Sequence, residues 1–262
     1  MSFRPHLLLI LMILVVHSQL GADSRPNILF IFADDQRADT IAALGNPVIK
    51  TPNLDRLVRS GVAFNRAYMQ GGMNVATCMP SRAMLLSGRN LFHVKDNLQE
   101  NGACIDTWPA AFARSGYTTF MTGKWHNSPE SLPYSFQFAR SVYPHGFGNP
   151  MELDVCNLAN GKLGPAHKVA KHSCAVFSDE AIQFINTPKD RPFFAYVAYD
   201  APHDPHIVPP DFNIHYSATD IPLPGNFLPQ HPWNNGEMTV RDELLLPWPR
   251  QPEAVKAYLA EY

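Results

Sequence analysis

The stretch NILFIFA, residues 27–33, runs directly into Asp34 and Asp35, and it decides the fold that we expect. A continuous apolar run of this kind is typical of a strand that is buried on both faces, as in a parallel sheet. A second such run, PFFAYVAY, covers residues 192–199, and a shorter one covers residues 117–121. Strands of this type separated by helices predict an α/β fold with a largely parallel central sheet flanked by helices.

Helices are predicted between and after these strands from their start and stop signals. Threonine can cap a helix, proline fits the first turn, and glycine suits the position after the last turn. Thr51, Pro52 and Gly61 stand in that order. The predicted helices are the segment between Thr51 and Gly61 and residues 80–87, 106–115, 173–185 and 252–262.

Composition and charge exclude several classes of protein. The chain has 262 residues, of which 45% are hydrophobic, and 21 Lys and Arg against 23 Asp and Glu give a net charge of −2. This balance excludes a strongly basic nucleic-acid-binding protein, and the apolar content is too high for a disordered chain. Four cysteines are too few for a disulfide scaffold. We therefore expect a globular domain with no nucleic-acid partner.

The N-terminus has the pattern of an export signal. Arg4 and His6 precede an apolar run over residues 7–16, and small residues lead to Ala22. This run is too short to cross a bilayer, which takes about 20 residues. We predict a cleaved signal peptide over residues 1–22, with a short uncleaved anchor as the alternative. The mature domain, residues 23–262, is expected to be periplasmic or secreted, with no stable membrane span.

Polar side chains follow each of the three predicted strands. Ligands bind outside the carboxyl ends of strands in open α/β sheets, so these side chains are expected to meet at one edge of the sheet. They are Asp34 and Asp35 after the first strand, Lys124 and His126 after the second, and His203 and His206 after the third.

The adjacent carboxylates of Asp34 and Asp35 are a candidate cation site. Two such groups repel each other unless a cation lies between them, and their hard oxygens suit Ca²⁺ or Mg²⁺. A solvated turn is the alternative. Zinc held by the later histidines with Cys78 or His126 is a further possibility, but no tight Cys/His spacing supports it.

Cys78 and Arg82 lie where a loop is predicted to enter a helix. The start of a helix favours anions, so a cysteine there is expected to have a lowered pKa and is a candidate nucleophile. Arg82, one turn further on, could pair with an anionic group. A buried structural cysteine is the alternative, and the chemistry of the residues leaves both readings open.

Several motifs, in order, resemble the formylglycine-dependent sulfatase family, and the iduronate- and choline-type bacterial enzymes look most similar. The resemblance runs from Arg25 to the end of the chain and implies an alkaline-phosphatase-like fold. The motifs are residues 25–35, residues 51–55 with 61–64, Cys78-Met-Pro-Ser-Arg82 followed by residues 86–89, Gly123-Lys-Trp-His126, and Ala201-Pro-His203.

The resemblance also implies a reaction. A maturation enzyme would oxidise Cys78 to formylglycine, whose hydrated aldehyde attacks a sulfate ester of a small molecule or glycan and later expels sulfate. Arg82 would stabilise this nucleophile and His126 would orient it. Lys124 and His203 would contact sulfate or the leaving oxygen. His206 lies beyond the family motif and could contact substrate.

The metal site implied by the resemblance is incomplete in this sequence. Asp34, Asp35 and the modified Cys78 would bind one Ca²⁺ or Mg²⁺. The family adds a second acidic pair and a further lysine after a later strand, and neither is found here. The predicted helix over residues 252–262 also lacks a stop signal. We therefore expect a fold truncated at its C-terminus, before the second pair of metal ligands.

Two other functions stay open. One is hydrolysis of phosphate or phosphonate esters by a member of the same superfamily, although serine or threonine is usual there in the place of Cys78. The other is an inactive truncated fragment that retains weak binding of sulfated glycans, which the missing metal ligands favour.

Overall fold

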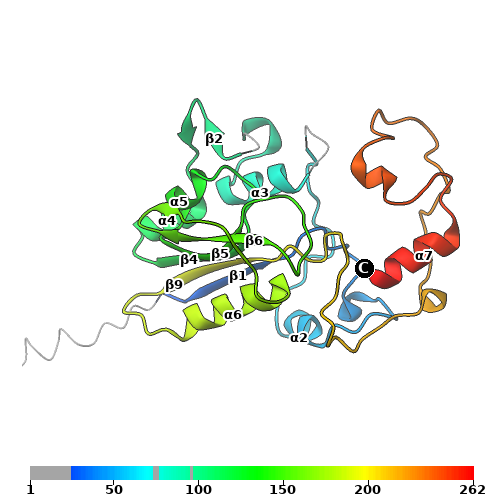
Figure 1. The fold of residues 1–262 in the computed structure, drawn as a ribbon, viewed down its shortest axis with the longest axis horizontal. Coiled ribbons are helices and arrows are strands. Elements are labelled where there is room, and N and C mark those ends of the chain that lie inside the picture. The colour runs from blue at the N-terminus through cyan, green and yellow to red at the C-terminus, as the bar shows by residue number, and fades with distance from the viewer. Residues whose placement is uncertain (1–24, 73–76, 95–96) are drawn as a thin grey trace, which may run out of the picture.

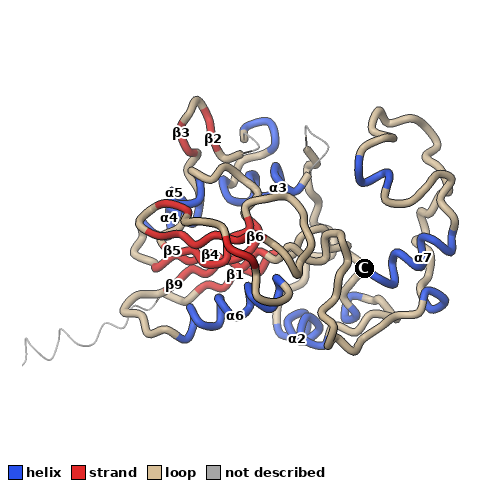
Figure 2. Tube along the Cα trace, in the orientation of Figure 1, coloured by secondary structure: helices blue, strands red, loops and turns tan. Residues whose placement is uncertain are grey.

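The computed structural model describes residues 25–72, 77–94 and 97–262, so the predicted signal peptide lies outside the described residues. One mixed sheet runs through the middle of the molecule, with helices on both sides (Figures 1 and 2). No helix in the described ranges has the length and apolar character needed to cross a membrane. The strand order is β1 (Ile28–Phe32), β9 (Phe193–Ala198), β4 (Thr118–Lys124), β5 (Phe138–Tyr143), β6 (Asp154–Ala159) and β7 (Lys162–Leu163), and β8 (His167–Lys168) pairs with β6.

The three strands predicted from the sequence are present and lie side by side. The prediction that the first is buried on both faces is wrong, because β1 lies at the edge of the sheet with Leu29 and Ile31 about half exposed. β9 pairs in parallel with β1 on one side and with β4 on the other. Ala198 at the end of β9 is in register with Phe32 of β1 and with Gly123 of β4. All three strands therefore deliver the residues that follow them to the same carboxyl edge.

The sequence did not predict β5 to β8. β5 reads FARSVY, in which polar and apolar side chains mix without a long apolar run. It extends the parallel part of the sheet beside β4, whereas β6, β7 and β8 are antiparallel. The sheet is thus parallel over β1, β9, β4 and β5 only.

Helices cover both faces of the sheet. In Figure 1, α3, α4 and α5 lie above it, α6 lies below it, and α2 and α7 lie toward the right, beyond the end of β1. The predicted helices are all present, although α3 begins two residues earlier than expected, at Cys78. Their bounds are α2 (Pro52–Ser60), α3 (Cys78–Ser87), α4 (Trp108–Arg114), α5 (Ser131–Ser135), α6 (Ser173–Asn186) and α7 (Pro252–Glu261).

Aromatic side chains pack the helices onto the sheet. On the α4 face, Trp108 lies 4.7 Å from Phe194 and 5.2 Å from Phe30, measured between ring centroids. On the α6 face, Phe184 stacks on Phe120 at 4.3 Å. Burial of such large rings on both faces holds the sheet rigid and fixes the position of its carboxyl edge.

Gly123 allows the close approach of β4 and β9 at that edge. Its φ is +99°, and a Cβ atom built there would lie 1.9 Å from the carbonyl oxygen of Ala198. We expect Gly123→Ala to lower the free energy of unfolding in urea by about 3 kcal/mol, through overpacking and backbone strain.

Gly236→Ala is the matched control for this substitution. Gly236 also has a positive φ, +89°, but a Cβ there meets nothing within 4 Å. It should cost only the backbone strain, about 1 kcal/mol. Equal destabilisation by the two variants would show that the contact with β9 does not matter.

Candidate active site

A cavity of about 390 Å³ opens at the carboxyl edge of the sheet, and we call it the Cys78 cavity. Four residues singled out in the sequence line it together: Asp35, Cys78, His126 and His203. They come from the segment after β1, the start of α3, the segment after β4 and the segment after β9. The convergence expected from the parallel strands is therefore present in the structure.

Cys78 is the first residue of α3, and its sulfur lies 3.1 Å from Nδ1 of His126. Burial raises the pKa of the Cys78 thiol, and this effect exceeds the lowering by the nearby cations Lys124 and Arg82. The sequence-based expectation of a lowered pKa is therefore wrong in direction. Position at a helix start alone does not make this side chain a thiolate, because desolvation disfavours the charged form.

Beneath the cavity, Asp34 is buried between two cations. The ammonium of Lys124 bonds one carboxylate oxygen of Asp34, and the guanidinium of Arg82 lies 3.3 Å from the other. Arg82 also donates to the backbone carbonyl of Lys124 at 2.7 Å. Asp35 lies in the cavity wall, so the carboxylates of Asp34 and Asp35 together balance the charges of Lys124 and Arg82. The two cations are more deeply buried than the two carboxylates.

His126 is held neutral by its surroundings. Burial, followed by the charges of Lys124 and Arg82, lowers the pKa of the His126 imidazole from 6.5 to about 4. Its backbone is left-handed, with φ 47°. Such strain persists only where surrounding contacts fix a residue, here in a position facing the sulfur of Cys78.

The lowered pKa of His126 predicts how stability depends on pH. An unfolded histidine titrates near 6.5, so between about pH 6.5 and pH 4 the unfolded chain binds more protons than the folded one. Stability should therefore fall as the pH decreases through that window, and less steeply in His126→Gln. An NMR titration of the His126 ring should give a midpoint near 4; a midpoint near 6.5 would contradict the burial argument.

His203 faces the opposite wall of the cavity. Its Nδ1 lies 2.7 Å from the backbone carbonyl of Asp204, which accepts only from a protonated nitrogen. Nε2 therefore points toward Asp35, whose carboxylate lies 3.6 Å away. Burial and the neighbouring charge of Asp34 raise the pKa of Asp35. The pair can hold or move a proton at Nε2 of His203.

His206 is not brought to the cavity. Its ring meets Tyr258 and Tyr262 edge-on, at centroid distances of 4.9 and 5.2 Å. It lines a neighbouring pocket, which His203 also lines. A contact between His206 and a substrate in the Cys78 cavity is not supported by this placement.

The described residues do not by themselves fit the divalent cation that was expected. No group of three or more His, Cys, Asp or Glu side chains in the described ranges is arranged to hold a metal ion, which also leaves the zinc alternative without support. Asp34 is already paired with Lys124 and Arg82. Asp34 and Asp35 would supply only part of the roughly six to eight oxygens that Ca²⁺ takes.

Sequence reasoning missed a second wall of the cavity. His145 and Phe147 follow β5, and Arg241 comes from the Pro-rich excursion after β9. The rings of Phe147 and His203 are parallel, with their centroids 6.2 Å apart. The guanidinium carbon of Arg241 lies 4.2 Å from the centroid of the Phe147 ring. The sequence signal for this wall is the run His145-Gly-Phe directly after β5. Because β5 was not predicted, the residues at its carboxyl end were not considered as site residues.

Gly146 lets this wall reach the catalytic edge. A Cβ built at Gly146 would lie 2.9 Å from the His126 ring, so a larger residue would push the imidazole aside. The loop after β5 therefore covers the face of His126 and helps to desolvate it.

A mixed sheet that is parallel over β1, β9, β4 and β5 and covered by helices, with a cysteine, histidines and a buried charge cluster at its carboxyl edge, places the chain among α/β proteins of the alkaline-phosphatase-like class. The family model described as "Sulfatase" matches residues 26–258. The chain therefore belongs to the sulfatase family.

Curated relatives agree with this assignment. The chain is 29% identical over 208 residues to N-acetylglucosamine-6-O-sulfatase of Bacteroides thetaiotaomicron, which covers 77% of this chain and 35% of the relative. It is 28% identical over 224 residues to mouse iduronate 2-sulfatase, covering 75% of this chain and 38% of the relative. The chain thus spans well under half the length of these relatives.

Solved structures share the fold. One, described in complex with its substrate D-glucosamine-2-N,6-O-disulfate, is 28% identical with a TM-score of 0.59, covering 70% of this chain and 36% of the other. A phosphonate monoester hydrolase of Agrobacterium radiobacter gives a TM-score of 0.62 at 23% identity, covering 91% and 56%. The second likeness shows the fold alone.

Proposed function

We propose that this chain carries the nucleophile-bearing part of a sulfatase that hydrolyses sulfate esters. The observation that carries the proposal is the 3.1 Å contact between Cys78 and His126 inside a cavity at the carboxyl edge of the sheet. Membership of the sulfatase family supports the type of reaction. The substrate of the solved relative, a sulfated glucosamine, supports a sulfated sugar as the class of substrate.

Cys78 is proposed to act after conversion to formylglycine by a maturation enzyme. The raised pKa of its thiol argues against a thiolate nucleophile. Formylglycine supplies a hydrated aldehyde, with one hydroxyl to attack the ester and a second that lets sulfate leave. The position of Nδ1 of His126, 3.1 Å from the sulfur of Cys78, supports the proposal, because a hydroxyl in the place of the sulfur would lie within hydrogen-bonding distance of it.

The other residues have distinct proposed roles. Nε2 of His203 faces the cavity, and when both ring nitrogens carry a proton it can give one to the leaving alcohol, because Nδ1 keeps its proton on the Asp204 carbonyl. Arg82 and Lys124 are buried beneath the cavity and favour an anionic group above them through their charge. Asp34 holds those two cations in place. A cation bound by Asp34 and Asp35 would need ligands besides these two side chains.

The choice between ester classes is tested with matched aryl sulfate and aryl phosphate substrates. We expect the higher kcat/KM for the sulfate, because the Asp35 carboxylate in the cavity wall opposes the second negative charge of a phosphate monoester. A strong preference for phosphate would contradict the proposal and favour the phosphoesterase alternative.

The remaining predictions from the N-terminus are part of the same proposal. We propose export to the periplasm or the exterior, with residues 1–22 as the signal peptide.

Calorimetric titration with Ca²⁺ and a sulfated sugar tests the inactive-fragment alternative, which requires binding without turnover.

A further inference from the structure

We propose that Tyr262 is a positioning residue of the active site: its hydroxyl closes the turn that carries Asp35 and so fixes Asp35 in the wall of the Cys78 cavity. The proposal rests on the proposed function for its catalytic consequence. The two hydrogen bonds that the Tyr262 hydroxyl makes with this turn, which we call the clamp, can be tested without measuring catalysis. Tyr262 follows α7, far along the chain from the segment after β1.

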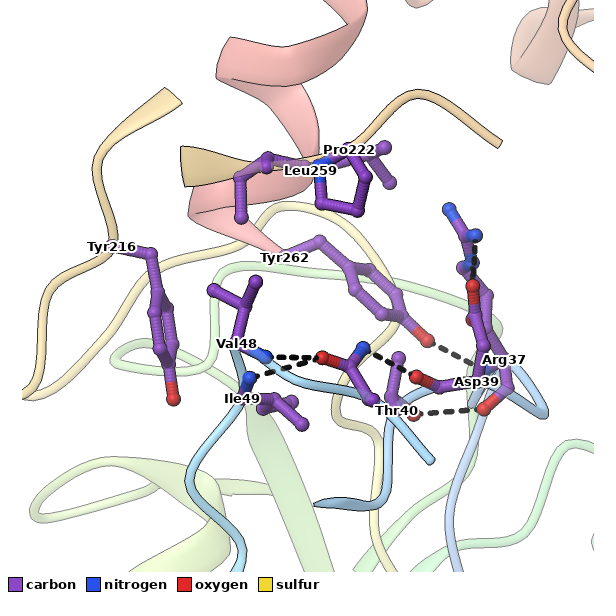
Figure 3. A pocket seen from close by; sticks show the side chains of 11 residues that line it. Arg37, Asp39, Thr40, Val48, Ile49, Tyr216, Pro222, Leu259 and Tyr262 are labelled. Carbon is purple, nitrogen blue, oxygen red and sulfur yellow. Dashed lines mark hydrogen bonds and ion pairs between the residues drawn. The ribbon is translucent and has the colours of Figure 1, made fainter. Parts of the chain in front are cut away.

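One hydroxyl makes both hydrogen bonds of the clamp. The backbone N–H of Arg37 donates to the Tyr262 hydroxyl at 2.7 Å, and that hydroxyl donates to the backbone carbonyl of Asp35 at 2.8 Å. The two backbone groups are two residues apart, so the hydroxyl bridges a turn that has no direct bond across it. Figure 3 shows the Tyr262 hydroxyl pointing at the Arg37 segment.

The carbonyl of Arg37 accepts from the N–H of Thr40 at 3.3 Å and from its hydroxyl at 2.7 Å, but neither bond reaches the two groups that the Tyr262 hydroxyl joins. Asp35 is left-handed, with φ 59°, a conformation that Asp adopts more readily than most residues. Asp34 N–H is tied to the carbonyl of Ala201 at 3.1 Å. Within the described ranges no other hydrogen bond reaches the carbonyl of Asp35 or the N–H of Arg37. Removing the hydroxyl therefore frees both groups at once.

The surroundings hold the Tyr262 ring in place. It lines a small cavity of about 100 Å³ together with Val48, Pro222 and Leu259 (Figure 3). The loop that faces the Tyr262 ring, residues 37–46, has polar side chains that pair with groups of the same loop, as in the ion pair between Arg37 and Asp39 at 2.6 Å. The loop thus offers the hydroxyl no competing side-chain partner.

The clamp reaches the chemistry through Asp35. Its carboxylate lies 3.6 Å from Nε2 of His203, the nitrogen proposed to protonate the leaving group. A turn that relaxes would move this carboxylate relative to the imidazole. Displacing one wall of the cavity from its place beside Cys78 should lower kcat, whereas the other walls do not move and KM should change little.

Tyr262→Phe tests the clamp, because it removes the hydroxyl and keeps the ring. Tyr216→Phe is the matched control. Tyr216 lines the same small cavity, and its hydroxyl accepts from the N–H of Lys50 at 2.9 Å, away from the turn. In NMR amide exchange, Tyr262→Phe should speed exchange of Arg37 about tenfold and leave Lys50 unchanged, and Tyr216→Phe should do the reverse.

Kinetics decide whether the clamp positions the site. With an aryl sulfate, Tyr262→Phe should lower kcat about tenfold with KM within about twofold of wild type, and Tyr216→Phe should change neither. Unchanged exchange at Arg37 would overturn the clamp whatever the activity. Faster exchange with unchanged kcat, in an enzyme that Cys78→Ala inactivates, would overturn its catalytic consequence.

The two proposals fail in different ways. If Cys78→Ala retains full hydrolysis, the proposed function is wrong, and exchange at Arg37 still decides the clamp. If Cys78→Ala is inactive but the Arg37 amide of Tyr262→Phe exchanges at the wild-type rate, the proposed function is supported and the clamp is wrong.

Discussion

Replacing Cys78 with alanine is expected to abolish sulfate ester hydrolysis, with kcat/KM for an aryl sulfate falling at least about 1,000-fold. The reason is that the proposed nucleophile forms from the Cys78 side chain, and the alanine methyl group can be neither oxidised to an aldehyde nor hydrated. The fold should persist, because Cys78 is only partly buried, and among the described residues its side chain makes a polar contact with His126 alone.

Cys104→Ala is the control for this substitution. Cys104 is also a free thiol, in the short strand β3 (Ala103–Cys104), which pairs with β2 (Gln99–Glu100) outside the central sheet. It should keep full activity. Activity near wild type in Cys78→Ala would refute the assignment of the nucleophile.

The state of Cys78 can be read directly by mass spectrometry. Trypsin cuts after Arg66 and Arg82, so Cys78 lies in the peptide of residues 67–82. Protein made together with a maturation enzyme should contain the aldehyde in this peptide. If such a protein shows only thiol yet hydrolyses sulfate esters, the formylglycine proposal is wrong.

Asp34→Asn should give the largest loss of stability among the charged residues of the site. Asp34 is buried and accepts from Lys124, with Arg82 3.3 Å away, and both cations are almost fully buried. Removing its charge leaves the two buried cations with only the more exposed Asp35 as a nearby counter-charge. Breaking a buried ion pair in this way costs about 3–5 kcal/mol, and we expect a decrease of that size in the free energy of unfolding in urea.

Asp106→Asn gives the matched comparison on the surface. Asp106 and Arg114 form an ion pair at 2.7 Å with both side chains more than half exposed. Exposed pairs of this kind contribute roughly 0–1 kcal/mol. If Asp34→Asn destabilises the protein no more than Asp106→Asn, the buried cluster does not depend on its carboxylate.

Local patterns predicted the parts of the fold that consist of long apolar runs. β1 and β9 were found because each reads as a nearly continuous apolar segment, and β4 was found from the shorter run over residues 117–121, although of the three only β4 and β9 are buried inside the sheet. The convergence of Asp35, Lys124 and His203 followed from strand direction alone, since parallel strands end at one edge. β5 was not predicted because its mixed sequence gives no periodic signal. The cavity wall formed by His145 and Phe147, which follow β5, was missed for the same reason.

The sequence by itself therefore determined the class of fold, the edge at which the candidate site forms and the residues that we propose to carry its reactive groups. Only the tertiary structure decided their protonation and their fixed geometry. Burial raises the pKa of Cys78 although it stands at a helix start, and the Tyr262 hydroxyl reaches the turn at Asp35 from the far end of the chain. Desolvation and long-range hydrogen bonds depend on which groups surround a side chain in space, and neighbours along the chain do not reveal that.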